Sequence, residues 1–108
     1  GNVEIGSNNC IAKGTLSNTI IEDNVKTDNL VHIAHNCHIK KGVIITACSE
    51  LSGGVVVGEN AWLGPNSSII QKVSIGKGAF VGIGAVVTKP IEENYLYAGN
   101  PAKKIKKL

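Results

Sequence analysis

Large aliphatic residues recur along most of this chain at intervals of six. From position 21 onward the series consists of Ile21, Ile33, Ile39, Ile45, Leu51, Val57, Leu63, Ile69, Ile75, Val81 and Val87, and Thr27 is its polar member. An amphipathic helix would space apolar residues by about 3.6 positions, and a half-buried strand would alternate them with polar ones. A period of six matches neither pattern. It is typical of a parallel β-helix, in which each hexapeptide is one short strand plus a turn.

A second series of small or β-branched residues lies four positions after the members of the first from Ile21 to Val81: Val25, Val31, Cys37, Val43, Ser49, Val55, Ala61, Ser67, Val73, Ala79 and Ala85. Three hexapeptides make one coil of eighteen residues. Residues eighteen apart should therefore lie on neighbouring coils, separated by about 4.8 Å as paired strands are. The sequence predicts an all-β fold, a parallel β-helix of hexapeptide repeats with about five coils.

The N-terminal part departs from the period. Ten residues separate Ile11 from Ile21, so four extra residues fall within positions 13–20. They predict a loop that protrudes from the first coil, either functional or simply solvated. Because the chain begins already in register, we expect the first coil to be covered by a further domain or by another element.

The C-terminal part is expected to differ from the coils. Pro90 should stop the repeat, Tyr95 and Tyr97 should fold over the last coil, and a lysine-rich terminus, considered as a helix, should begin at Pro101. The predicted division is a β-helix over 1–92 and a C-terminal cap with a basic tail over 93–108.

Composition supports a coil with a narrow interior. The 108 residues include 13 glycines but only four aromatic residues, and the chain is 43% hydrophobic. There is no apolar run of the roughly 18 residues that a membrane span requires and no secretory leader pattern, so a cytoplasmic protein is expected. The three cysteines form no CxxC pair, and we expect them to be small buried residues rather than disulfides or zinc ligands.

The net charge of +3 does not indicate nucleic-acid binding. Four of the eleven basic residues lie in the last six positions, which leaves seven against eight acidic residues elsewhere. A nucleic-acid surface would need a clustered basic stripe with interleaved aromatic residues. The tail could instead meet a phosphate or remain solvated.

The chain's three histidines, His32, His35 and His38, fall within seven positions. His35 follows the interior Ile33 by two, which predicts an outer position near a corner. His32 and His38 each precede an interior residue by one and should project outward. Their spacing does not bring three rings together as i, i+4 on a helix would, so no metal site is expected.

Two groups of motifs carry a resemblance to hexapeptide-repeat acyltransferases over essentially the whole chain. Residues 14–19 and 28–36, which contain Ile-Ala-His-Asn, resemble the acylglucosamine N-acyltransferases of lipid A synthesis. Residues 86–90 and 98–103 are similar to the ending of acetyl-CoA-dependent sugar acetyltransferases. The resemblance implies a left-handed β-helix and a homotrimer with active sites between subunits.

The resemblance also implies roles for individual residues. His35 matches the catalytic base, which fits the chemistry because imidazole can take a proton from an attacking amine or hydroxyl. Gly53, eighteen residues later, matches the backbone donor to the oxyanion. Neighbouring polar residues, Asn29, His32, Asn36 and His38, are candidates for substrate binding.

The chain departs from the family pattern at two places. The lipid A enzymes carry a second histidine where this chain has Gln71 and Lys72, which weakens the case for an acyl-carrier-protein donor. Acetyltransferases often follow the base with Glu, and here Asn36 stands instead. Asp28 is considered as the orienting carboxylate, although a turn carboxylate is the favoured interpretation.

We therefore expect an acyltransferase that moves an acyl group, most simply acetyl from acetyl-CoA, to an amino or hydroxyl group of a sugar or nucleotide sugar. No tightly bound cofactor is expected. The co-substrate acetyl-CoA should run near Gly82, Gly84 and Ala85, with Lys89 and Lys103 meeting its phosphates. The alternatives are an acyl-carrier-protein-dependent enzyme, a non-catalytic scaffold or, with the least support, a zinc carbonic anhydrase of this fold.

Overall fold

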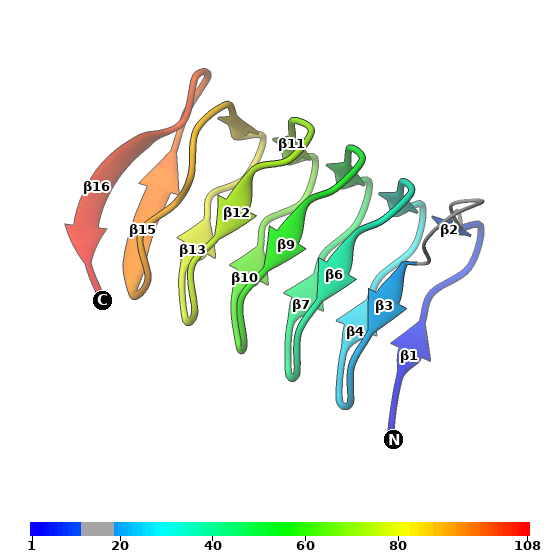
Figure 1. Cartoon of the computed structure of the whole chain (residues 1–108). Coiled ribbons are helices and arrows are strands. Elements are labelled where there is room, and N and C mark those ends of the chain that lie inside the picture. The colour runs from blue at the N-terminus through cyan, green and yellow to red at the C-terminus, as the bar shows by residue number, and fades with distance from the viewer. Residues whose placement is uncertain (12–18) are drawn as a thin grey trace.

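The computed structural model describes residues 1–11 and 19–108 (Figure 1). Within these ranges the secondary structure consists of short strands, two residues long except for the last two: β1 Glu4–Ile5, β2 Cys10–Ile11, β3 Ile20–Ile21, β4 Lys26–Thr27, β5 His32–Ile33, β6 His38–Ile39, β7 Ile44–Ile45, β8 Glu50–Leu51, β9 Val56–Val57, β10 Trp62–Leu63, β11 Ser68–Ile69, β12 Ser74–Ile75, β13 Phe80–Val81, β14 Val86–Val87, β15 Tyr95–Ala98 and β16 Lys103–Lys107. The described ranges contain no helix long and apolar enough to cross a membrane.

The strands form three parallel sheets along the faces of a triangular prism. From β1 to β14 every third strand belongs to the same sheet, and β15 and the antiparallel β16 extend the first sheet, giving the orders β1-β4-β7-β10-β13-β15-β16, β14-β11-β8-β5-β2 and β12-β9-β6-β3. Figure 1 shows the coils stacked in one direction from the N-terminus to the C-terminus. The fold is the expected left-handed parallel β-helix of about five coils.

The register between coils is eighteen residues through most of the chain. Ile33 pairs with Leu51, and Ile39 pairs with Val57. The first coil differs, because Ile5 pairs with Thr27 and Ile11 with Ile33, both 22 residues apart. The four extra residues therefore fall between β2 and β3. The predicted protruding loop itself lies largely outside the described residues.

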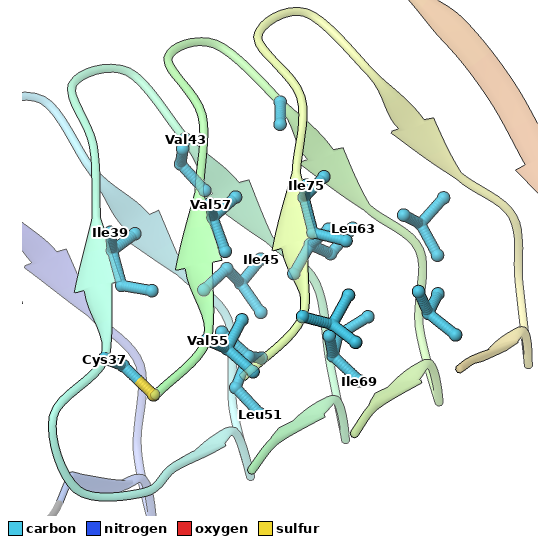
Figure 2. Close-up of a cluster of buried hydrophobic side chains, with 14 of the residues drawn as sticks. Cys37, Ile39, Val43, Ile45, Leu51, Val55, Val57, Leu63, Ile69 and Ile75 are labelled. Atoms are coloured by element: carbon cyan, nitrogen blue, oxygen red, sulfur yellow. The ribbon is translucent and has the colours of Figure 1, made fainter. Parts of the chain in front are cut away.

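The interior is a column of aliphatic side chains one coil apart, as Figure 2 shows. Ile33, Ile39 and Ile45 are fully buried, as are Leu51 and Leu63. The polar Thr27 is also buried, and its hydroxyl accepts a hydrogen bond of 2.8 Å from the Asn9 side chain. A hydrogen-bonded hydroxyl can be buried at little cost, which explains how one polar residue is accommodated in the series.

Close stacking of the coils explains a group of glycines directly after the strands. A Cβ added at Gly58 would lie 2.5 Å from the backbone nitrogen of Lys77, and one at Gly64 would lie 2.7 Å from the Val81 carbonyl oxygen. No side chain fits in such a space without moving the backbone. These glycines are therefore required by the fold.

Two sequence expectations about buried and terminal residues are wrong. Cys37 is buried, but Cys10 and Cys48 are exposed. Cys10 points outward because it precedes the interior Ile11, and Cys48 occupies a corner with φ of 62°. The lysine-rich terminus forms strand β16, antiparallel to β15, rather than a helix.

Pro90 shortens the repeat and does not stop it. Ile91 still bridges to Ile75, and Tyr97 pairs with Val81, but both separations are sixteen residues instead of eighteen. Ile91 is buried, and Tyr97 packs against the core, as expected for a residue that covers the last coil. The β15–β16 hairpin then continues the sheet of β13.

Candidate active site

His35 lies in the turn between β5 and β6, at the corner where one face of the prism meets the next. The flanking residues Ile33 and Cys37 point into the core, which directs the turn outward. Asn36 completes the turn with φ of 61° and, like His35, is exposed. An exposed imidazole on a rigid corner has the placement that proton transfer to an external substrate requires.

Gly53 occupies the same corner one coil further on. The next residue, Gly54, donates its backbone N–H to the carbonyl oxygen of His35 at 2.9 Å, which fixes the two turns against each other. Among the residues that the structure describes, a Cβ added at Gly53 would have one non-adjacent neighbour within 4 Å, the His35 carbonyl oxygen at 3.6 Å. That is an ordinary contact distance, so the fold itself does not require glycine here.

Gly53 differs in this respect from the other glycines of the coils. Gly58 and Gly64 are required by close packing, and Gly42, Gly54 and Gly78 have positive φ. Gly53 has neither constraint. Its missing side chain leaves space directly beside His35, where a reacting group could approach the backbone.

His32 and His38 lie on the two faces that meet at the His35 corner. On one face, His32 Nδ1 is 3.8 Å from Glu50 Oε2. On the other, His38 Nε2 contacts Glu22 Oε2 at 2.5 Å, and Glu22 Oε1 accepts the Lys41 backbone N–H. The hydrogen bond from His38 lowers the pKa of the Glu22 carboxyl, with smaller contributions from the Lys41 N–H and nearby positive charge.

The three histidines do not converge. His35 is at a corner, while His32 and His38 are on strands of two different sheets. Within the described ranges, no group of three or more histidine, cysteine or acidic side chains is arranged to hold a metal ion.

Asn29 and Asp28 lie at a different corner, before β5. The Asn29 side chain accepts the Ser7 backbone N–H, and Asp28 accepts that of Asn29, both at 2.8 Å. One hexapeptide, which contains β5, separates this corner from His35, so the two corners lie at opposite ends of one prism face. Asp28 is thus a turn carboxylate at a different corner from His35, in line with the favoured interpretation. Asn29 is engaged in coil stacking, away from His35.

The corner of His35 continues along the prism as a row of exposed or half-buried turn residues, which we call the His35 edge: His35, Gly53, Gln71 and Lys89. The order follows from the eighteen-residue register, with the Lys72 N–H bonded to the Gly53 carbonyl oxygen and Ile69 paired with Val87. Three coil steps cover about 14 Å.

A pocket of about 330 Å³ lies at the Lys89 end of this edge. It is lined by Lys89 and Pro90 from the turn and by Tyr97, Lys103 and Lys104 from the hairpin. Lys104 Nζ is paired with Glu92 Oε2 at 2.7 Å, and this hydrogen bond raises the pKa of Lys104. The pocket brings together Lys89 and Lys103, the two predicted phosphate-binding lysines. Among the described residues, neither of them forms an ion pair.

The other residues expected near the donor lie elsewhere. Gly82 and Gly84 are at the corner after β13, and Gly82 packs under Ala98 of the hairpin. Ala85 is fully buried, its N–H bonds to Gly82, and its carbonyl accepts the Ser68 N–H. The Ala85 side chain therefore points into the core, and the expectation that the donor passes near its backbone stays a prediction.

Two features of the site were missed from the sequence. The Glu22–His38 pair joins residues sixteen apart, so it crosses from one coil to the next diagonally and not along the eighteen-residue register. The pocket wall formed by Tyr97 and Lys104 depends on the shortened last coil. The shortening could have been anticipated from Pro90, but its two-residue size could not.

Comparison with protein families identifies a match over most of the chain. The model of the bacterial transferase hexapeptide family, which comprises six repeats, matches residues 18–53 and again residues 54–89. The two matched segments contain His35, Gly53 and all the residues of the His35 edge.

Curated relatives share about a third of their residues with this chain. A UDP-3-O-acylglucosamine N-acyltransferase of Caulobacter sp. (strain K31) is 35% identical over 97% of the chain, and a probable mitochondrial one of Arabidopsis thaliana is 37% identical over 93%. The chain spans only 31% and 33% of these relatives.

Solved structures with the same fold include two sugar acyltransferases. GDP-perosamine N-acetyltransferase of Caulobacter crescentus, a variant bound to CoA and GDP-perosamine, superposes with a TM-score of 0.87 at 28% identity, over 97% of this chain and 51% of that one. The UDP-N-acetylglucosamine O-acyltransferase of Moraxella catarrhalis gives a TM-score of 0.86 at 27% identity, over 97% and 44%.

Proposed function

The chain belongs to the bacterial transferase hexapeptide family, and on that premise we propose that it transfers an acetyl group from acetyl-CoA to an amino or hydroxyl group of a sugar or nucleotide sugar. The observation that carries the proposal is the stacking of Gly53 on His35. The described structure has room for a Cβ at position 53, yet the chain has glycine there, next to the turn of the exposed His35.

In the proposed reaction His35 is the general base. The lone pair of the acceptor nitrogen or oxygen attacks the thioester carbonyl carbon, and His35 removes the proton from the attacking atom. The carbonyl electrons move to the oxygen, where the Gly53 N–H can donate to the oxyanion. Collapse of the tetrahedral intermediate re-forms the carbonyl and expels the CoA thiolate, which receives the proton from His35.

The donor is proposed to lie along the His35 edge. Its thioester would be at Gly53, its pantetheine arm would pass Gln71, and its phosphates would meet Lys89 and Lys103 in the pocket at the end. Support comes from the collinear register of these turns and from the two lysines without an ion-pair partner in the described structure. The donor path thus differs from the one expected near Gly82 and Gly84.

The acceptor is proposed to be a sugar or nucleotide sugar because both solved relatives named above act on such molecules. His32, Asn36 and His38 surround the His35 corner and would contact it. We also propose a homotrimer in the cytoplasm, with a neighbouring subunit completing the cleft and the three thiols kept reduced.

A second candidate is transfer from an acyl carrier protein, as in the lipid A pathway. The observation that favours it is the 35% identity to a UDP-3-O-acylglucosamine N-acyltransferase over nearly the whole chain. Both donors present a pantetheine thioester, but only CoA carries the adenosine phosphates that the Lys89 and Lys103 pocket would bind. A donor comparison therefore separates the two.

The test is a thiol-release assay with acetyl-CoA and a panel of amino sugars and nucleotide-linked amino sugars, followed by acyl-carrier-protein thioesters. We expect His35→Ala to lower kcat/KM by about 100-fold or more. Lys77→Ala, which changes an exposed residue at the equivalent position of another corner, is the control and should keep wild-type activity. Full activity of His35→Ala contradicts the proposed base, and no transfer from any donor favours a scaffold.

A further inference from the structure

Lys72 occupies a backbone conformation that lysine rarely adopts. Its φ is 63°, and it is the turn residue that follows Gln71 on the His35 edge. At the equivalent position of other turns the chain mostly uses asparagine or glycine, as at Asn36, Gly54 and Asn60. The left-handed region is unfavourable for residues with a Cβ, except that asparagine tolerates it better. A lysine here has a conformational cost that the fold does not require.

The Lys72 side chain leans toward the coil that carries Gly53 and Gly54. The Cβ position of Gly54 is 3.3 Å from Lys72 Cγ, closer than the 3.7 Å to Lys72 Cα. Side chains at this position of other turns lean the same way, since Asn60 Oδ1 lies over Gly42 and Asn94 Oδ1 over Gly78. The stem of Lys72 is thus directed back toward the Gly53–Gly54 turn, which stacks on the His35–Asn36 turn.

The ammonium group beyond this stem has no carboxylate partner in the described structure. Lys72 is exposed, and none of the ion pairs of the described residues includes it. Beneath it lie Gly53 and Gly54, two residues without side chains. Among the described residues, the exposed Lys72 side chain therefore starts above two residues that have no side chains of their own.

We propose that Lys72 is a further catalytic residue, whose ammonium group stabilises the negative oxygen formed at Gly53. This inference rests on the proposed function. When the acceptor attacks, the thioester carbonyl electrons move to oxygen, and the Lys72 ammonium and the Gly53 N–H face that oxygen from one side. No proton leaves Lys72. Its contribution is electrostatic, and it is greatest in the transition state, where the charge develops.

The conformational cost gives this proposal a signature that a structural lysine would not show. Lys72→Gly should relieve the strained backbone, so the midpoint of urea denaturation should rise, while kcat should fall by about tenfold or more with little change in KM. Lys72→Gln keeps the Cβ but loses the charge, so it should lower kcat without the gain in stability. Lys72→Arg keeps the charge and should retain most of the activity.

The matched control is Cys48→Gly, because Cys48 occupies the equivalent turn position at another corner with φ of 62°. This variant should gain stability and keep its kcat. All variants are assayed as the intact chain with the donor and acceptor that support wild-type transfer.

Three results overturn the inference. Wild-type kcat in Lys72→Gly means that the ammonium group does not contribute to the reaction. A rise in KM alone means that Lys72 binds a phosphate of a substrate in the ground state. Absence of transfer by the wild-type chain with every donor overturns the proposed function as well, whereas the first two results leave that function intact.

Discussion

The carbonyl oxygen of His35 lies 3.6 Å from the position that a Cβ on Gly53 would occupy, and no other non-adjacent residue of the described ranges comes within 4 Å of that position. Room for a methyl group therefore exists above His35. Packing therefore does not explain why position 53 is glycine. In the proposed reaction the reason is access, because the thioester oxygen must reach the Gly53 N–H.

Gly53→Ala tests this reasoning. The variant should fold normally, with a free energy of unfolding within about 1 kcal/mol of wild type, since the backbone is not in the left-handed region. Its kcat should fall by about 100-fold because the methyl group displaces the oxyanion from the N–H. Urea denaturation and the thiol-release assay measure the two quantities.

Gly64→Ala provides the contrasting variant. Its Cβ would lie 2.7 Å from the Val81 carbonyl oxygen, so the coils must separate locally. We expect a loss of about 2 kcal/mol in the free energy of unfolding. If Gly53→Ala is destabilised as strongly as Gly64→Ala, Gly53 is a packing glycine and the access argument is wrong.

The six-residue period was sufficient to predict the interior and the corner of His35. Each residue of the series from Ile33 to Val87 is buried at its expected place, because a rigid repeat converts sequence position directly into three-dimensional position. The same arithmetic placed Gly53 above His35. In this fold, a residue on one coil is matched with its neighbour on the next coil by counting eighteen positions.

The period could not predict contacts that depend on side-chain direction or on a change in coil length. Glu22 contacts His38 diagonally across two coils. Lys72 leans over Gly54 because of a backbone conformation that could not be predicted from the sequence. The lysine pocket requires the sixteen-residue last coil. The small size of Ala85 was interpreted as access for the donor to the backbone, and in the structure the same small size fits a buried side chain.

Leu30 offers a stability prediction away from the site. It has φ of 60° in a turn, and its side chain is 55% exposed, so removing the side chain exposes little buried apolar surface. Leu30→Gly should raise the free energy of unfolding by about 1 kcal/mol, because the left-handed conformation no longer involves a Cβ. Asn60→Gly, where asparagine already tolerates φ of 60°, should change it by less than half as much. Equal effects in both variants would contradict the strain explanation.

The Glu22–His38 contact predicts an acid-sensitive contribution to stability. The pKa of Glu22 is lowered from 4.5 in the folded chain, chiefly by the hydrogen bond from His38. In the window below pH 4.5 the unfolded chain therefore binds more protons than the folded one, and stability rises with pH. The contribution is complete above pH 4.5 and is lost as the pH falls through the folded value.

Glu22→Gln should remove this part of the pH dependence. Urea denaturation from pH 3 to pH 6 should give a shallower rise in the free energy of unfolding for Glu22→Gln than for wild type. Glu93→Gln, which changes an exposed acidic residue without an ion pair in the described structure, should follow the wild-type curve. A wild-type slope in Glu22→Gln would show that the contact does not persist in solution.

Lys89 and Lys103 should affect only donors that carry phosphates. Both residues line the pocket at the end of the His35 edge, about three coils from His35, whereas Lys104 is already paired with Glu92. We expect Lys89→Ala and Lys103→Ala each to raise the KM for acetyl-CoA about tenfold, with kcat preserved, and to leave the KM for an acetyl-pantetheine thioester unchanged. The increase should shrink at high salt because screening already weakens the wild-type contact. Equal increases for both donors would show that the lysines do not bind the phosphates. The donor would then have to lie along another corner.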